Sequence, residues 1–390
     1  MSLYNKRGVS AQKEEVHQAI EKLDQGLFPH AFCKMYPDFI SGDDNYINIM
    51  HADGAGTKSI LAYLYSKETG DTSVWKGIAQ DAVAMNLDDL LCVGIYDNIL
   101  FSSTIDRNKS LIGGDILKEI INGTQDFFDE LKQYGVNIHY LGGETADVGD
   151  VVRTIAVNGT MTARQEKSKI ISNEKIAEGN VIVGFGSSGK AVYEKEYNSG
   201  LGSNGLTSAR HDVLKKTYAE KYPETFESTL PEDVVYIGHQ SLTDGLEIEN
   251  FGKINVGKLL LSPTRTYAPL MKRLLQEHFS DIYGVIHCSG GGQTKCMKYL
   301  PKALRVVKDN LFEAPPIFKL IQKNSGADYR EMYQVFNMGH RLEIFTNENA
   351  AQYMIAIAEE LDIEAKIIGY TEASDKKELV LKLKDDELVY

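Results

Sequence analysis

The sequence predicts a mixed α/β fold, of the α+β type, in two domains. Strand-like and helix-like segments alternate along the chain, and 390 residues are enough for two hydrophobic cores. A polar stretch over residues 162–179 separates the halves, so we expect domains at residues 1–165 and 175–390. Each domain should contain a mixed sheet packed with helices.

In the first half, apolar residues at helical spacing predict helices and alternating ones predict strands. The expected helices are Ala11–Leu23, Val74–Cys92 and Asp115–Gln133. The expected strands are Tyr46–Met50, Asp97–Thr104, Ile138–Leu141 and Val151–Met161.

The second half shows the same alternation. Its expected strands are Val181–Phe185, Val285–Cys288, Leu342–Phe345 and Lys366–Tyr370. Its expected helices are Ser203–Tyr218, Thr264–Phe279, Pro315–Gln322 and Asn347–Leu361.

Composition excludes several classes of protein. The formal net charge of −13 disfavours nucleic acid as the main partner, because phosphate backbones need a basic surface. Apolar runs are too short to span a membrane and the N-terminus lacks a secretory signal, so we expect a cytoplasmic protein without a membrane partner. The four cysteines form no C-x-x-C pair, which indicates scattered reduced thiols.

The segment from Asp53 to Lys58 is the most informative one. It reads Asp-Gly-Ala-Gly-Thr-Lys directly after a predicted strand. Glycines let backbone N–H groups approach an anion, a carboxylate can hold a divalent cation, and lysine adds a positive charge. The spacing does not fit a Walker A loop. A plain strand-to-helix turn capped by Asp53 or Thr57 is the alternative.

Acidic residues recur near apolar elements. Asp81 and Asp88 are two helical turns apart and share one face, with Asp89 beside them, so they are either paired, bound to a metal or part of a solvated face. Gly143 and Glu144 follow a predicted strand, where we expect either a turn that contacts phosphate or metal, or a turn that Glu144 caps.

Two further features lie in loops. Gly290, Gly291 and Gly292 precede a predicted helix, which suits a phosphate, although a flexible turn is an equal alternative. His51 and His287 lie near glycine loops, and a hydrogen-bonded structural role is the simpler interpretation of each.

Together and in this order, the motifs resemble the aminoimidazole ribonucleotide synthetase (phosphoribosylformylglycinamidine cyclo-ligase) family. Asp53–Lys58 is similar to the family's D-G-V-G-T-K, and Gly142–Asp147 to its G-G-E-T-A-E, two elements that a wider ATP-binding superfamily shares. More specific are Ser262–Tyr267, which resembles A-P-T-R-I-Y, and the late segments Pro315–Gln322 and Phe336–Gly339. The similarity covers nearly the whole chain.

The resemblance implies ATP-dependent cyclisation of a phosphorylated ribonucleotide, with ATP and Mg²⁺ as cofactors. It implies an ATP- and magnesium-binding N-terminal domain that pairs into a barrel in a homodimer, and a C-terminal domain that completes the cleft. Asp89 and Lys58 are the expected catalytic residues, and Asp53, Asp89 and Glu144 the expected metal ligands. Cofactor contacts are expected from Asp53, Gly54, Gly56, Thr57, Lys58, Asp81, Gly143 and Glu144, and substrate contacts from Ser203, Asn204, Gly290, Gly291 and Gly292.

Three departures from the family pattern matter. The segment Gly26–Lys34 replaces a glycine-rich loop with a lysine, so ATP contacts there are not transferred. Residues Lys190–Leu201 interrupt the family's S-S-G-x-H-S-N-G, and Gly202 stands where its histidine would be. Arg341 follows F-N-M-G-H in place of a small or apolar residue, either to grip a substrate phosphate or as a surface residue.

Two alternatives stay open at this level. One is another ATP-dependent enzyme of the superfamily, such as a small-molecule kinase. The other is a non-catalytic nucleotide-binding regulator, an alternative that the altered loop and the absent histidine favour.

Overall fold

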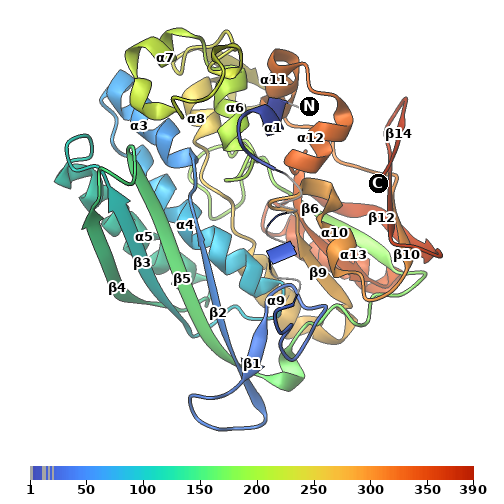
Figure 1. Ribbon diagram of the computed structural model, residues 1–390. Coiled ribbons are helices and arrows are strands. Elements are labelled where there is room, and N and C mark those ends of the chain that lie inside the picture. The colour runs from blue at the N-terminus through green and yellow to red at the C-terminus, as the bar shows by residue number, and fades with distance from the viewer. Residues whose placement is uncertain (1–2, 11–14, 16–17, 20–21) are drawn as a thin grey trace.

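The structure is a computed structural model that describes residues 3–10, 15, 18–19 and 22–390. The helix predicted over Ala11–Leu23 falls mainly outside the described residues. A short helix α1 (Leu3–Lys6) precedes that segment. The rest forms a mixed α/β architecture in two domains, each a mixed sheet packed with helices (Figure 1).

The first domain contains a five-stranded sheet in the order β1-β2-β5-β3-β4. Its strands are β1 (Met35–Pro37), β2 (Tyr46–Gly54), β3 (Ile99–Arg107), β4 (Ile138–Asp147) and β5 (Ile155–Glu166). Only β3 and β4 pair in parallel, so the sheet is mixed. Buried and exposed residues alternate along β3, because one face of the sheet packs on helices and the other does not.

Two strands of this sheet are much longer than predicted. Strand β2 continues through Asp53, and β4 continues through Glu144 to Asp147. The turn predicted at Gly143 and Glu144 is therefore wrong: both residues pair with β3. A turn there would leave the backbone groups of β3 without partners, whereas Gly142 at φ +86° lets β4 shift register and continue.

The helices of the first domain are α3 (Lys58–Thr69), α4 (Val74–Leu91) and α5 (Gly114–Gln133). In α4, 15 of 18 residues are buried, as expected for a helix that is covered on all sides. It lies between the first sheet and the second domain (Figure 1). The helix that carries Asp81, Asp88 and Asp89 is thus the seam between the domains.

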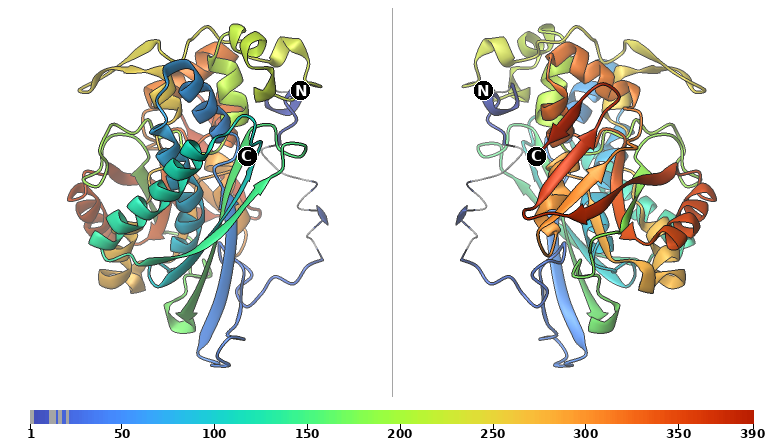
Figure 2. Two further views of the ribbon diagram at one scale, coloured as in Figure 1. Left: turned by 90° about the vertical axis from the view of Figure 1, so that its left-hand side faces the viewer. Right: turned by 90° about the vertical axis from the view of Figure 1, so that its right-hand side faces the viewer.

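The second domain contains a seven-stranded mixed sheet in the order β14-β13-β10-β12-β6-β11-β9. Its strands are β6 (Val181–Gly186), β9 (Gly284–His287), β10 (Leu304–Lys308), β11 (His340–Thr346), β12 (Ala365–Ala373), β13 (Glu378–Lys382) and β14 (Glu387–Val389). A separate hairpin of β7 (Gly245–Ile248) and β8 (Gly252–Asn255) projects from the body (Figure 2).

The remaining helices follow β6 along the chain. They are α6 (Leu206–Val213), α7 (Thr217–Lys221), α8 (Val256–Leu260), α9 (Ala268–Glu277), α10 (Cys296–Tyr299), α11 (Pro316–Ser325), α12 (Tyr329–Val335) and α13 (Glu348–Glu359). Short 3-10 turns cover Lys167–Lys169, Pro223–Thr225, Glu232–Val234, Phe279–Asp281 and Gly292–Lys295. The helix predicted over Thr264–Phe279 begins at Ala268, since the residues before it are held against α4.

Two further properties concern the described part of the chain. Across the described ranges, every helix is too short or too polar to cross a membrane. All four cysteines are free and buried, as the absence of a C-x-x-C pair predicts.

Candidate active site

Two aspartates of α4 hold the second domain against the first. Asp81 Oδ1 accepts hydrogen bonds from the backbone N (2.7 Å) and Oγ1 (2.6 Å) of Thr264. Two turns later, Asp88 Oδ1 accepts from Oγ1 of Thr266 (2.5 Å) and the backbone N of Tyr267 (3.3 Å). Both carboxylates are fully buried, so the solvated-face alternative is wrong.

Lys58 is enclosed in the same seam. Its Nζ lies 2.8 Å from Asp81 Oδ1 and 2.6 Å from the carbonyl of Ser262, and the side chain is fully buried. Burial lowers the pKa of Lys58, and Asp81 partly offsets that effect. In this arrangement the ammonium group links the domains and is enclosed, and its expected phosphate contact stays a prediction.

Asp89 is held between two histidines. Its Oδ1 lies 2.6 Å from His287 Nδ1, and its Oδ2 lies 3.1 Å from His51 Nε2. Although burial alone raises the pKa of a carboxyl group, hydrogen bonds from His287 and His51 hold the pKa of Asp89 well below its usual range. Both carboxylate oxygens are engaged, which leaves Asp89 poorly suited to bind a metal ion in this arrangement.

The neighbouring donors and acceptors indicate where both histidines carry protons. An arginine can only donate, so His287 Nε2 accepts from Arg341 Nε (3.0 Å) and its proton sits on Nδ1, facing Asp89. The amide nitrogen of Asn86 faces three carbonyls, so Asn86 Oδ1 faces His51 Nδ1 at 3.0 Å. Asn86 Oδ1 and the Asp89 carboxylate are both acceptors, so the contacts of His51 favour its doubly protonated form.

The charge on His51 agrees with its surroundings. Burial lowers the pKa of His51, but Asp89 and Asn86 outweigh burial and the pKa is raised. The His51 side chain is 20% exposed, which makes it the end of the network nearest to solvent.

Arg341 closes the network on the other side. Its Nη2 lies 3.3 Å from Asp88 Oδ2, and the side chain is 2% exposed. The surface-residue alternative for Arg341 is therefore wrong. We call His51, Asp89, His287, Arg341 and Asp88 the seam network.

Asp53 and Glu144 do not join the seam network. Asp53 pairs with Gly159, which faces α4, whereas Glu144 pairs with Thr104 on the exposed face of the sheet. Their strands are separated by β5 and β3, so the two carboxylates are about three strand spacings, roughly 14 Å, apart and on opposite faces. The predicted magnesium site of Asp53, Asp89 and Glu144 is not formed within one chain.

Most of the predicted glycine sites of the first domain require glycine for structural reasons. A Cβ at Gly143 would lie 2.1 Å from the carbonyl of Ser103, and one at Gly54 would lie 2.1 Å from Asn158 Oδ1. Gly56 adopts φ +58° with open space beside it, which suits a turn near a ligand. Thr57 Oγ1 hydrogen-bonds Thr207 across the seam at 2.9 Å.

The predicted substrate contacts lie together in the second domain. Ser203 Oγ hydrogen-bonds Thr264 Oγ1 at 2.9 Å, and the nearest atom to a Cβ at Gly290 would be Asn204 Nδ2, 3.5 Å away. Gly291 has φ +97°, whereas Gly292 packs so closely on the backbone of α12 that a Cβ would lie 2.4 Å from the Tyr333 carbonyl. Only the first part of this glycine loop is therefore open to a ligand.

The Lys190–Leu201 insertion is anchored to the seam. Glu194 forms a two-point ion pair with Arg265, at 3.0 Å from Nε and 2.5 Å from Nη2. Tyr193 donates its hydroxyl proton to the carbonyl of Thr266 at 2.6 Å. The insertion thus supports the segment that docks on α4, and it lines one side of a cavity of about 780 Å³.

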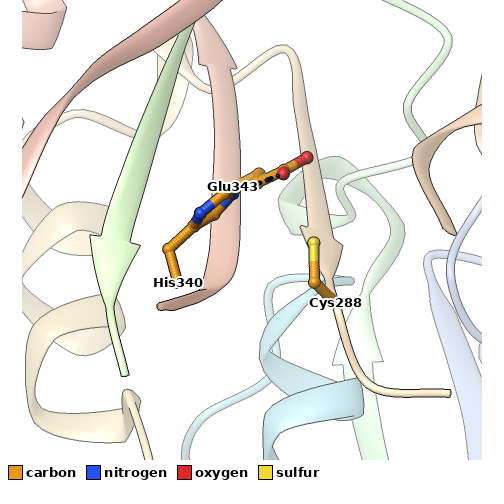
Figure 3. Close-up of side chains that lie close together, drawn as sticks. All are labelled: Cys288, His340 and Glu343. Carbon is orange, nitrogen blue, oxygen red and sulfur yellow. Dashed lines mark hydrogen bonds and ion pairs between the residues drawn. The ribbon is translucent and has the colours of Figure 1, made fainter. Parts of the chain in front are cut away.

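Within the described residues, one group of side chains lies close enough to bind a metal: Cys288, His340 and Glu343 (Figure 3). His340 Nε2 lies 2.8 Å from Glu343 Oε1, which also pairs with Lys308 Nζ. Because this ammonium group already neutralises Glu343, a divalent cation does not fit beside it. We call these four residues the sealed cluster, since all of them are buried in one domain.

Sequence patterns did not indicate the seam network. The spacing of residues 89, 287 and 341 follows no motif, because three separate elements supply them. One clue was available: His51 and Asp53 alternate on one strand face, so His51 should face the same side as Asp53.

The comparisons with families and named proteins cover both domains. Residues 39–164 match the N-terminal domain, and residues 177–382 the C-terminal domain, of the family described as AIR synthase related protein. The phosphoribosylformylglycinamidine cyclo-ligase of Methanocaldococcus jannaschii is 30% identical over 83% of this chain and 78% of its own. That of Methanococcus vannielii is 29% identical over 98% of this chain and 97% of its own.

Solved structures share the fold. T. maritima PurL complexed with ADP aligns with a TM-score of 0.55 at 12% identity, over 99% of this chain and 49% of that chain. AaThiL complexed with AMPPCP and TMP aligns with a TM-score of 0.53 at 10% identity, over 97% and 95% of the two chains. At such low identities, the similarity shows the fold alone.

Proposed function

Because this chain belongs to the AIR synthase related family, we propose that it is an ATP-dependent cyclo-ligase of de novo purine biosynthesis. It converts formylglycinamidine ribonucleotide into aminoimidazole ribonucleotide and releases ADP and phosphate. The observation that carries this proposal is the similarity to enzymes named cyclo-ligases over nearly the whole chain, at 97% coverage of one relative's own length. We keep the cytoplasm as the expected location.

The chemistry suits a cleft that mainly positions its reactants. The formyl oxygen of the substrate attacks the γ-phosphorus of ATP, ADP leaves, and the oxygen becomes part of a good leaving group. A nitrogen of the same molecule then attacks the formyl carbon, the carbon–oxygen bond breaks, and phosphate leaves with loss of a proton. Ring closure is intramolecular, so orientation supplies much of the rate.

Several residues at the seam support this role. Ser203, Asn204 and Gly290 lie together and are proposed to orient the ribonucleotide. His51, as an imidazolium held by Asp89, provides positive charge near Asp53 for the phosphates of ATP. Asp89 acts through this histidine and is a positioning residue.

Magnesium is expected to accompany ATP. Asp53 is the best-placed predicted ligand in one chain, because histidines engage Asp89 and Glu144 lies on the other face of the sheet. The three predicted ligands do not fit one ion, so the proposed mechanism places no step on a protein-bound metal. The Lys58 ammonium is assigned to the seam and not to phosphate.

The test of the proposed function is direct. The purified chain is mixed with formylglycinamidine ribonucleotide and Mg-ATP, and the product is identified by mass spectrometry together with free phosphate. We expect one phosphate per aminoimidazole ribonucleotide. A phosphorylated product without ring closure would indicate a kinase, and binding of ATP without hydrolysis would indicate a regulator; both alternatives are disfavoured by the names of the full-length relatives.

We further propose that two first domains pair through the exposed face of the first sheet. Met50, Leu100 and Leu141 are 71%, 39% and 64% exposed there, an unusual number of apolar side chains for a solvent-facing sheet. Light scattering at micromolar concentration should give a dimer, and Leu100→Lys should weaken it. A monomeric wild-type chain would contradict the pairing.

A further inference from the structure

Arg341 occupies a special position in β11. The register between β11 and β6 shifts between His340 and Leu342, so Arg341 is the bulged residue. A bulge re-aims the side chain of the extra residue away from the sheet alternation. The Arg341 guanidinium therefore lies in the seam between the domains.

The guanidinium is held firmly on two of its three nitrogens. Nε donates to His287 Nε2 at 3.0 Å, and Nη2 donates to Asp88 Oδ2 at 3.3 Å and to the carbonyl of Arg265. The ring of Tyr267 lies 5.5 Å from the guanidinium carbon. These contacts fix the plane of the group before any ligand binds.

The third nitrogen, Nη1, is different. It forms no hydrogen bond with any residue in the described part of the chain. Unlike Arg7 Nη2, which also lacks a partner, it is not fully enclosed by protein atoms. Nη1 therefore borders space that solvent can reach. A fixed, charged donor that borders such space is suited to a phosphate oxygen.

Gly202 lies directly against this nitrogen. A Cβ at Gly202 would be 3.1 Å from Nη1, and the residue has φ +71°, which favours glycine. Arg341 thus fills the volume in which a side chain at position 202 would stand. The two departures from the family pattern are therefore neighbours in space: the arginine at 341 occupies the room that the glycine at 202 leaves free.

We propose that Nη1 of Arg341 is the donor of a phosphate-binding subsite in the seam, beside Gly202. Its ligand is a phosphoryl oxygen, either from the phosphate monoester of the ribonucleotide or from the nucleotide triphosphate. That this phosphate belongs to a reactant rests on the proposed function. Asp88 and His287 keep the donor in place and do not contact the ligand.

Two variants test the subsite. Arg341→Lys keeps the charge but loses the rigid fork, and Gly202→Asn leaves Arg341 intact but offers Nη1 an internal amide oxygen in place of the ligand. Asparagine tolerates a positive φ better than most residues. Gly252→Asn is the matched control, since Gly252 has the same φ of +71° with nothing within 4 Å of its Cβ position.

Binding is measured by calorimetry with ribose 5-phosphate and, separately, with a non-hydrolysable ATP analogue. We expect both variants to bind one of these probes roughly 10- to 100-fold more weakly, whereas the control binds as the wild type does. A loss of affinity for ribose 5-phosphate assigns the subsite to the phosphate monoester, and a loss of affinity for the ATP analogue assigns it to the triphosphate.

The subsite proposal is overturned if Gly202→Asn and a correctly folded Arg341→Lys both bind the probes as tightly as the wild type. It is also overturned if the wild-type chain binds neither probe at millimolar concentration. Turnover is not the readout. Failure of the cyclisation assay would therefore overturn the proposed function and leave the subsite standing.

Discussion

The seam network and the sealed cluster are both buried groups of charges, but only one of them has an opening. The seam network joins two domains and ends at His51, which is 20% exposed, and at Arg341 Nη1. The sealed cluster lies inside the second domain, and Lys308, Glu343 and His340 are each at most 1% exposed. A buried charge cluster therefore identifies a functional site only when one of its ends can meet a ligand.

The largest expected effect concerns the sealed cluster. Lys308→Met should lower the free energy of unfolding by about 3–5 kcal/mol, because Glu343 would be left buried without its cation. Urea unfolding measures this change. Lys308→Met combined with Glu343→Gln should recover part of the loss, and exposed Lys382→Met is the control. A loss below about 1 kcal/mol would show that the pair is not a closed structural unit.

The pH dependence of the sealed cluster follows from Glu343. Burial alone would raise its pKa, but Lys308 and His340 outweigh burial and lower the pKa to about 2. A lowered pKa in the folded state means that this stability is present above about pH 4.5 and is lost as the pH falls toward 2.

The size of the loss is of the order of 3 kcal/mol for Glu343. Unfolding free energies between pH 6 and pH 3 should fall less steeply in Glu343→Gln than in the wild type. Identical slopes in the two proteins would contradict the assignment.

Asp89→Asn tests the seam network instead. The variant keeps the shape of the side chain but removes the charge that holds His51 as an imidazolium, so we expect turnover to fall by roughly 10²-fold with the fold retained. Steady-state kinetics at limiting Mg²⁺ measure the turnover of the variant and of the wild type. Exposed Asp126→Asn, which also loses an ion pair, serves as the control. Near-normal turnover would remove Asp89 from the mechanism.

The smallest expected effect is at Ser203. Ser203→Ala removes the hydrogen bond to Thr264 and any contact with the ribonucleotide. We expect the KM for the ribonucleotide to rise by roughly 2- to 10-fold with kcat unchanged, as for one neutral hydrogen bond. If KM stays constant and only the thermal unfolding midpoint drops, Ser203 stabilises the contact between the domains and does not bind the ribonucleotide.

The sequence predicted the fold class and most elements well. Helix α4 and strand β11 agree with the apolar patterns, because local periodicity reports which side of an element is buried. The predicted turn after β4 was wrong, since the glycines in that segment permit close strand pairing with Ser103 and do not end the strand. Local turn propensity cannot register a partner strand that lies elsewhere in the chain.

The candidate site was less predictable. The motifs placed Asp81, Asp89 and Ser203 near the seam, but they suggested a phosphate contact for Lys58, which is bound to Asp81. Neither spacing nor residue type tells whether a lysine faces a ligand or another domain.

What the sequence alone determined is the family, the two-domain α/β plan and the acidic face of α4, because motifs and periodicity are local properties. Tertiary structure decided the partners of those acids. Asp81 meets Lys58 and Thr264, Asp88 meets Arg341, and Asp89 meets His51 and His287, over sequence separations of up to 253 residues. Buried charges take whichever opposite charge or donor the packing of the two domains brings within reach, and that choice is set only when the chain is folded.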